Sequence, residues 1–65
     1  MSKYLMIGAC NGKPIFKQEY EQTPVWLMFR IGGNNWGFSE FENIRSAFEY
    51  YSKQYDVLTI MELPD

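Results

Sequence analysis

Hydrophobic and polar positions alternate in several short stretches of the chain, which is the pattern of half-buried β-strands. The first two stretches are residues 3–9 and residues 14–19, and Asn11-Gly12 lies between them. Asn-Gly is the strongest short hairpin signal, because both central residues of the favoured turn need a positive φ. The sequence therefore predicts an antiparallel hairpin. Its second strand begins at Pro14, which favours a position at a sheet edge.

Three more strands are indicated farther along the chain. Residues 25–31 combine β-branched, aromatic and long apolar side chains and form the most strand-like stretch. A turn cluster at residues 32–35 precedes a short strand at residues 36–38. Residues 56–63 form a last strand, which Pro64 ends.

One helix is predicted between the fourth and fifth strands. The run Ser39-Glu40-Phe41-Glu42 fits the S-x-x-E capping box, so the helix is expected to begin at Ser39 and to end near Gln54. Its apolar positions recur at spacings of three and four and therefore share one stripe: Phe41, Ile44, Phe48, Tyr51 and Tyr55. The order ββββαβ predicts an α+β fold for residues 1–65. We expect a single compact domain, with a small, mainly antiparallel sheet of four to five strands and one helix packed on one face.

One helix covers one face of a sheet, so the division of side chains between the two faces decides what is left exposed. Strand alternation assigns six positions to the core beneath the helix: Leu5, Ile7, Leu27, Phe29, Leu58 and Ile60. It leaves a candidate interface on the opposite face: Tyr4, Met6, Trp26, Met28, Arg30, Trp36 and Met61. Exposed apolar patches mark interaction surfaces, in which Trp, Tyr, Met and Arg are enriched. Two alternatives stay open: the hairpin folds over this face, or the register is shifted by one residue, which exchanges the faces.

The residue types present offer little to catalysis. The chain has no histidine, which is the commonest general base near neutral pH and the commonest metal ligand, and Cys10 is its one cysteine. With no histidine and one cysteine, a single chain cannot supply the ligands of a zinc site. The glycines near residue 32 lack the Lys-Ser/Thr ending of a phosphate-binding loop. We therefore expect no enzyme activity, no cofactor and no metal.

Charge and cysteine content restrict the classes of partner and the cellular compartment that we expect. Eight acidic and six basic residues give a net charge of −2, which disfavours a nucleic-acid partner without excluding it. Glu40, Glu42 and Glu49 form a candidate acidic surface for a second partner on the solvent side of the predicted helix. The apolar runs are too short for a membrane span or a signal-peptide core, and one cysteine cannot close an internal disulfide. A soluble cytoplasmic protein is expected.

Together these features predict a small non-enzymatic protein–protein interaction module that acts by occluding a surface of its partner. Self-association as a homodimer through the second sheet face is the first expectation, because the core is thin. Inhibitors that phages or mobile elements direct against host proteins are of this type, and we interpret the chain as one by analogy. The alternatives are an accessory subunit of a larger complex and a protein that stacks single-stranded nucleic acid on its aromatic sheet face.

Overall fold

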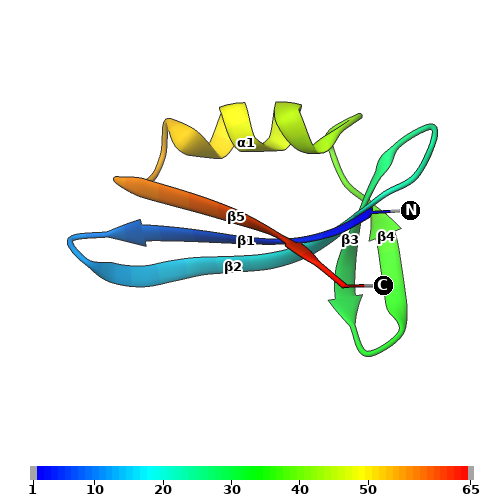
Figure 1. Ribbon diagram of the computed structural model, residues 1–65, viewed down its shortest axis with the longest axis horizontal. Coiled ribbons are helices and arrows are strands. Elements are labelled where there is room, and N and C mark those ends of the chain that lie inside the picture. Colours follow the sequence, from blue (N-terminus) through cyan, green and yellow to red (C-terminus); the bar gives the residue numbers. More distant parts are fainter. Residues whose placement is uncertain (1, 65) are drawn as a thin grey trace.

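The computed structural model describes residues 2–64 of the chain. Within this range it contains five strands and one helix: β1 (Ser2–Cys10), β2 (Lys13–Gln22), β3 (Leu27–Gly32), β4 (Asn35–Phe38), α1 (Ile44–Ser52) and β5 (Val57–Leu63). The strands form one antiparallel sheet in the order β4-β3-β2-β1-β5, and α1 lies along one side of it (Figure 1). The predicted α+β class and the element order ββββαβ are confirmed.

The β1–β2 hairpin is built on the predicted Asn-Gly turn. Asn11 has a φ of 54° and Gly12 a φ of 77°, the positive values that this two-residue hairpin turn requires. The register of the hairpin shifts once, between Gly8 and Ala9, which leaves Ile15 of β2 as an extra residue. Ile15 therefore forms a β-bulge, a feature that bends a strand and increases its twist.

β2 lies between β1 and β3, so the predicted edge position of this strand is wrong. β3 nevertheless pairs only with Tyr20, Glu21 and Gln22, at the end of β2. The half of β2 that contains Pro14 keeps one free side, where a residue without an N–H group is tolerated. Beyond this short contact β3 and β4 turn away, and in Figure 1 they run across the direction of β1 and β2.

The helix begins four residues later than the capping box predicts. Asn43 is its N-cap, and the Asn43 Oδ1 accepts the backbone N–H of Ser46 at 2.9 Å. Residues 39–41 are instead held against β3, because Ser39 N–H donates to the Leu27 carbonyl at 3.0 Å and Leu27 N–H donates to the Phe41 carbonyl at 3.3 Å. Backbone paired with a strand cannot enter a helix. This tertiary pairing moves the start of the helix from Ser39 to Asn43.

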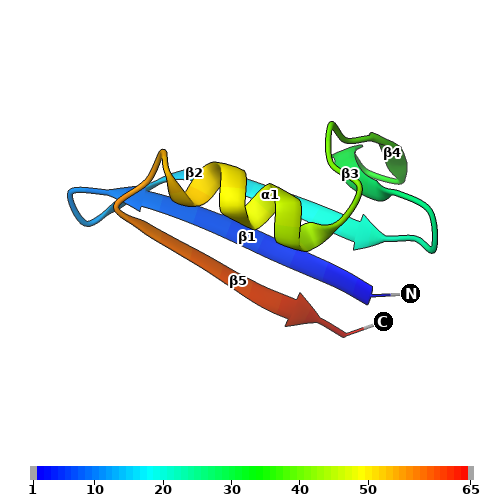
Figure 2. The same ribbon diagram turned by 90° about the horizontal axis from the view of Figure 1, so that it is seen from above.

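The core lies between α1 and the sheet, and its fully buried side chains are Met6, Tyr20, Leu27 and Ala47. Partly buried apolar side chains surround them: Phe16, Phe29, Phe41, Ile44, Phe48, Tyr51, Leu58 and Ile60. The predicted core positions on β3 and β5 are therefore confirmed. Seen from above in Figure 2, the helix lies over β1 and β2, and some residues of α1 also lie close to β5.

The prediction for β1 is wrong, because this strand presents its other set of side chains to the helix. Met6 has no exposed surface. Tyr4 shares its face, since it pairs directly with buried Tyr20. Leu5 and Ile7 consequently point to the side away from α1.

The physical reason for this choice is Gly8. It follows Met6 on the face of the sheet that α1 covers, which we call the covered face. A Cβ atom added at Gly8 would lie 2.7 Å from Cγ of the Tyr55 ring. Only glycine leaves room for that ring, which also stacks on Phe16 with centroids 5.4 Å apart. The face of β1 that carries the glycine therefore accepts the chain that follows the helix.

Candidate interaction surface

The side of the sheet opposite α1 is not crossed by another element in the part of the chain that the structure describes (Figure 1, Figure 2). All five strands contribute side chains to it, and we call it the open face. The register assigns to it Lys3, Leu5, Ile7 and Ala9 of β1, Lys17, Glu19 and Glu21 of β2, Met28 and Arg30 of β3, Trp36 and Phe38 of β4, and Val57, Thr59, Met61 and Leu63 of β5.

One row of the open face crosses the whole sheet. Met61 pairs with Leu5, and Leu5 pairs with Glu19 on its other side. Glu19 forms an ion pair with Arg30, and Arg30 pairs with Trp36. The row therefore runs from an apolar end on β5, through a pair of opposite charges, to an aromatic ring on β4.

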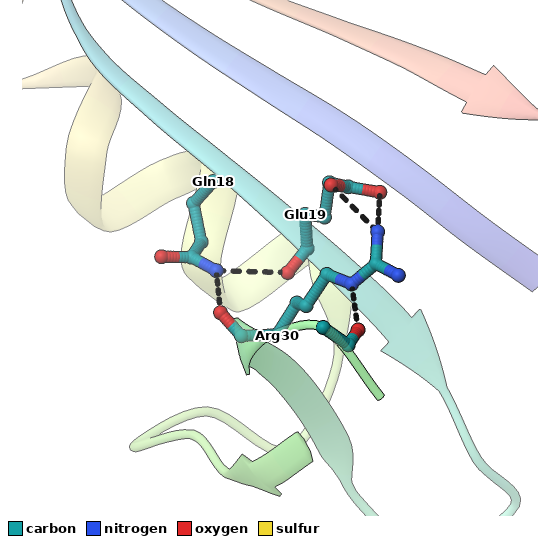
Figure 3. Close-up of polar contacts among 4 residues, drawn as sticks. Gln18, Glu19 and Arg30 are labelled. Carbon is teal, nitrogen blue, oxygen red and sulfur yellow. Dashed lines mark hydrogen bonds and ion pairs between the residues drawn. The ribbon is translucent and has the colours of Figure 1, made fainter. Parts of the chain in front are cut away.

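Arg30 is held on three sides near the centre of this row. Its Nη1 donates to both carboxylate oxygens of Glu19 at 3.1 and 3.2 Å, and its Nε donates to the Gly33 carbonyl at 2.7 Å (Figure 3). Its guanidinium carbon lies 5.7 Å from the centroid of the Trp36 ring, a distance that permits a cation–π interaction. The Arg30 and Glu19 side chains are 37% and 35% exposed, so solvent screening limits their ion pair to at most about 1 kcal/mol. These contacts fix the orientation of the guanidinium group more than they stabilise the fold.

An open crevice of about 540 Å³ lies where β2 and β3 diverge, lined by Lys17, Gln18, Glu19, Arg30, Ile31, Gly32 and Gly33. Gln18 bridges its inner end, because the side-chain Nε2 donates to the Arg30 carbonyl at 2.8 Å and to the Glu19 carbonyl at 3.0 Å (Figure 3). A side-chain amide thus takes the place of the next strand-to-strand hydrogen bond. It ends the β2–β3 ladder and leaves the crevice walls polar.

Two apolar flanks border the charged centre of the open face. On β3 and β4, Met28 pairs with Phe38, a residue that is 73% exposed, and Trp36 follows in the next row. On β1 and β5, Leu5 pairs with Met61, which is 46% exposed, and Val57 is 60% exposed. Exposure of large apolar side chains on one continuous face is the pattern expected of a surface that binds another molecule.

The structure divides the predicted interface residues between different places. Met28, Arg30, Trp36 and Met61 lie on the open face. Tyr4 and Met6 lie on the covered face, so their assignment to the interface is wrong for the reason given for β1.

Trp26 directly precedes β3, and its side chain is tied to the segment before the helix, so its place at an interface stays a prediction. Its indole Nε1 donates to the Ser39 carbonyl at 2.7 Å, and its backbone N–H donates to Thr23 Oγ1 at 3.0 Å. These two hydrogen bonds give Trp26 a structural role in anchoring residue 39 beside β3.

The candidate acidic residues lie on the helix side of the sheet. Glu40 and Glu42 precede α1 and Glu49 lies within it, and all three are exposed. The side chain of Glu42 therefore does not close a capping box, and these carboxylates are separate from the open face.

Sequence reasoning missed several members of the open face: Leu5, Ile7, Glu19, Phe38 and Val57. Phe38 could have been found, because it alternates with Trp36 along a strand. Leu5 and Ile7 carried no such signal, since their hydrophobicity is as compatible with a core position as with a place on the open face.

Tyr20 of β2 and Tyr51 of α1 are the two phenols whose ionisation is made less favourable by the fold. Burial raises the pKa of Tyr20 well above its ordinary value, and the neighbouring Tyr51 adds to the shift. Burial likewise raises the pKa of Tyr51. Both phenols are therefore neutral near pH 7 and contribute to packing, as the stacked rings of Phe16 and Tyr51 at 4.7 Å illustrate.

Within residues 2–64, no group of three or more His, Cys, Asp or Glu side chains is arranged to hold a metal ion. In the same range the helix present is too short and too polar to cross a membrane. Comparison with known proteins found no matching family model, no matching curated protein and no matching solved structure.

Proposed function

We propose that the chain is a small non-enzymatic protein–protein interaction module that binds a partner with its open face and acts by occluding the partner's surface. The observation that supports this proposal is the composition of that face. Large apolar side chains remain exposed on both flanks, with Phe38 73% and Val57 60% exposed. Burial of apolar area is the dominant favourable term in protein association, at about 25 cal/mol per Å² before the opposing entropy is counted.

The centre of the face supports the same proposal through its rigidity. Glu19 and Gly33 hold the guanidinium of Arg30 in place, and the Trp36 ring lies next to it. Trp and Arg are the residue types most often found as energetic anchors of interfaces. Because these two side chains are already ordered, less conformational entropy is lost when a partner binds.

The charges of the open face favour a protein over nucleic acid as the partner. Two of the three cations assigned to the open face have carboxylate neighbours: Arg30 is paired with Glu19, and Lys3 lies opposite Glu21 in the β1–β2 register, whereas Lys17 lies opposite Ile7. A strand of nucleic acid would need a basic groove beside the aromatic rings, whereas here two of these three cations have a carboxylate neighbour. A phage or mobile-element inhibitor of a host protein is the biological setting that we propose, by analogy with other small proteins that act by occlusion.

The proposal is tested by capture from a lysate of the source organism, with quantitative mass spectrometry of the bound proteins. We expect a protein that the wild type and a Val25→Lys control both capture, and that Phe38→Lys loses. Val25 is a matched control because it is 75% exposed and precedes β3 outside the open face. Equal capture by all three variants would contradict the proposal, as would salt-sensitive binding of labelled single-stranded oligonucleotides by the wild type.

A further inference from the structure

The sheet has three free strand edges in the part of the chain that the structure describes. They are the outer edge of β5, the outer edge of β4, and the split between β2 and β3, where the first half of β2 and the end of β3 are not paired with each other. A free edge presents unpaired backbone N–H and C=O groups, and these groups can pair with a strand of another chain. Native proteins usually protect such edges with lysine, proline, bulges or short strands.

Two of the three edges carry such protection. The free half of β2 contains Lys13, Pro14 and Lys17, a bulge at Ile15, and the Gln18 amide at its inner end. β4 is only four residues long. Neither edge offers another chain a long, regular row of backbone groups.

The edge of β5 lacks all of these features. β5 spans seven residues with the sequence VLTIMEL, which contains neither lysine nor proline. Its pairing with β1 runs without a register shift from Val57 to Leu63. Its charged residue is Glu62, and Val57 and Met61 remain 60% and 46% exposed.

We propose that β5 pairs antiparallel with β5 of a second copy, which joins two five-stranded sheets into one continuous sheet. The occupant is a second copy because the strand is its own complement about a two-fold axis at Ile60. In that register Thr59 lies opposite Met61, Val57 opposite Leu63, and Leu58 opposite Glu62 of the second copy. Like charges therefore never meet, and the exposed apolar side chains at either end of β5 gain apolar neighbours.

The same arrangement keeps the proposed function available. A two-fold axis perpendicular to the sheet places both helices on one side and joins the two open faces on the other. The dimer uses a strand edge and the proposed function uses a sheet face, so each can fail without the other.

The test is the mass in solution by light scattering, over a series of concentrations, for charge-swapped variants of β5. Thr59 and Met61 are exposed side chains of the open face, so charges there leave the core unchanged. In the proposed register, Thr59→Lys with Met61→Lys brings two like-charged pairs together in each dimer, and Thr59→Glu with Met61→Glu does the same with the opposite sign. We expect a wild-type dimer, two monomeric variants, and a dimer of the two variants when they are mixed in equal amounts.

The matched control is Val25→Lys with Ile31→Lys, which adds the same charge at two exposed apolar positions outside β5. This control is expected to remain a dimer. A wild type that stays monomeric, a dimer that survives the double lysine change in β5, a dimer lost equally in the control, or a mixture that stays monomeric would each overturn the proposal.

Hydrogen exchange of the wild type provides a readout that does not depend on the folding of any variant. Backbone amides of β5 that point away from β1 should exchange more slowly as the concentration rises, while those of the β4 edge should not change. Protection of β5 only when a different protein is bound, with the free chain a monomer throughout, would assign the edge to another partner and overturn the dimer.

Discussion

The ring of Tyr55 lies directly over Gly8, in the position that any larger side chain of β1 would need. A Cβ atom at Gly8 would be 2.7 Å from this ring, so Gly8→Ala should destabilise the fold by about 1–3 kcal/mol through overpacking. Gly32→Ala is the matched control, because nothing lies within 4 Å of a Cβ atom at Gly32. Urea unfolding should show a control close to the wild type, and equal midpoints for both variants would contradict the role of Gly8.

Met6 and Leu5 are neighbours on opposite faces of β1, and their truncation separates the two possible registers. Met6 has no exposed surface, so Met6→Ala should lower the free energy of unfolding by about 2–5 kcal/mol. Leu5 lies on the open face, so Leu5→Ala should have a clearly smaller effect. A larger loss for Leu5→Ala would instead place Leu5 in the core and Met6 on the opposite face.

Ionisation of the buried Tyr20 phenol makes the stability of the fold depend on pH in the alkaline range. Its folded-state pKa is raised by burial, so the neutral phenol is favoured by the fold. The stability that this provides is fully present below the unfolded value near pH 10 and declines above it, as the unfolded chain releases the proton. Urea unfolding of the wild type between about pH 7 and pH 11 should show this decline, and Tyr20→Phe should make it shallower. An unchanged decline in Tyr20→Phe would assign the effect to other groups.

At the scale of elements, two local signals compete for the start of α1. Asn43 Oδ1 accepts the N–H of Ser46 at 2.9 Å, so Asn43→Ala should cost about 1 kcal/mol of stability. Glu42→Ala should change stability by less than about 0.5 kcal/mol, although a capping box at Ser39 would give it a similar importance. Chemical denaturation of the two variants distinguishes a helix start at Asn43 from one at Ser39. A larger loss of stability for Glu42→Ala than for Asn43→Ala would favour the start at Ser39.

The elements that the sequence predicts well are those with local causes. The Asn11-Gly12 turn needs only the φ preferences of its own two residues, and each strand needs only its own alternation. The start of α1 depends on a non-local pairing, because Leu27 bonds to the backbone of residues 39–41. The position of β2 within the sheet depends on where the later β3 attaches, which Pro14 alone does not reveal.

At the scale of the whole molecule, the one helix and one sheet of residues 2–64 leave a second sheet face that no element in this range covers. Its existence follows from counting faces, and this part of the candidate site was predictable from the sequence. Its membership was only partly predictable, because a shift of one residue in a strand exchanges the faces. Met61 and Trp36 were assigned correctly by alternation, whereas the outcome for Met6 depended on the room that Gly8 leaves for Tyr55.

Hydroxyl-radical footprinting of the chain, alone and with the captured partner, tests most directly whether the open face is the docking surface. In the free chain Phe38 and Met61 should be modified readily and Met6 should be protected, since they are 73%, 46% and 0% exposed. When the partner is bound, modification of Phe38 should fall, while that of Tyr50 on the helix side should not change. A partner that protects Tyr50 and leaves Phe38 reactive would contradict the account and place the interaction on the helix.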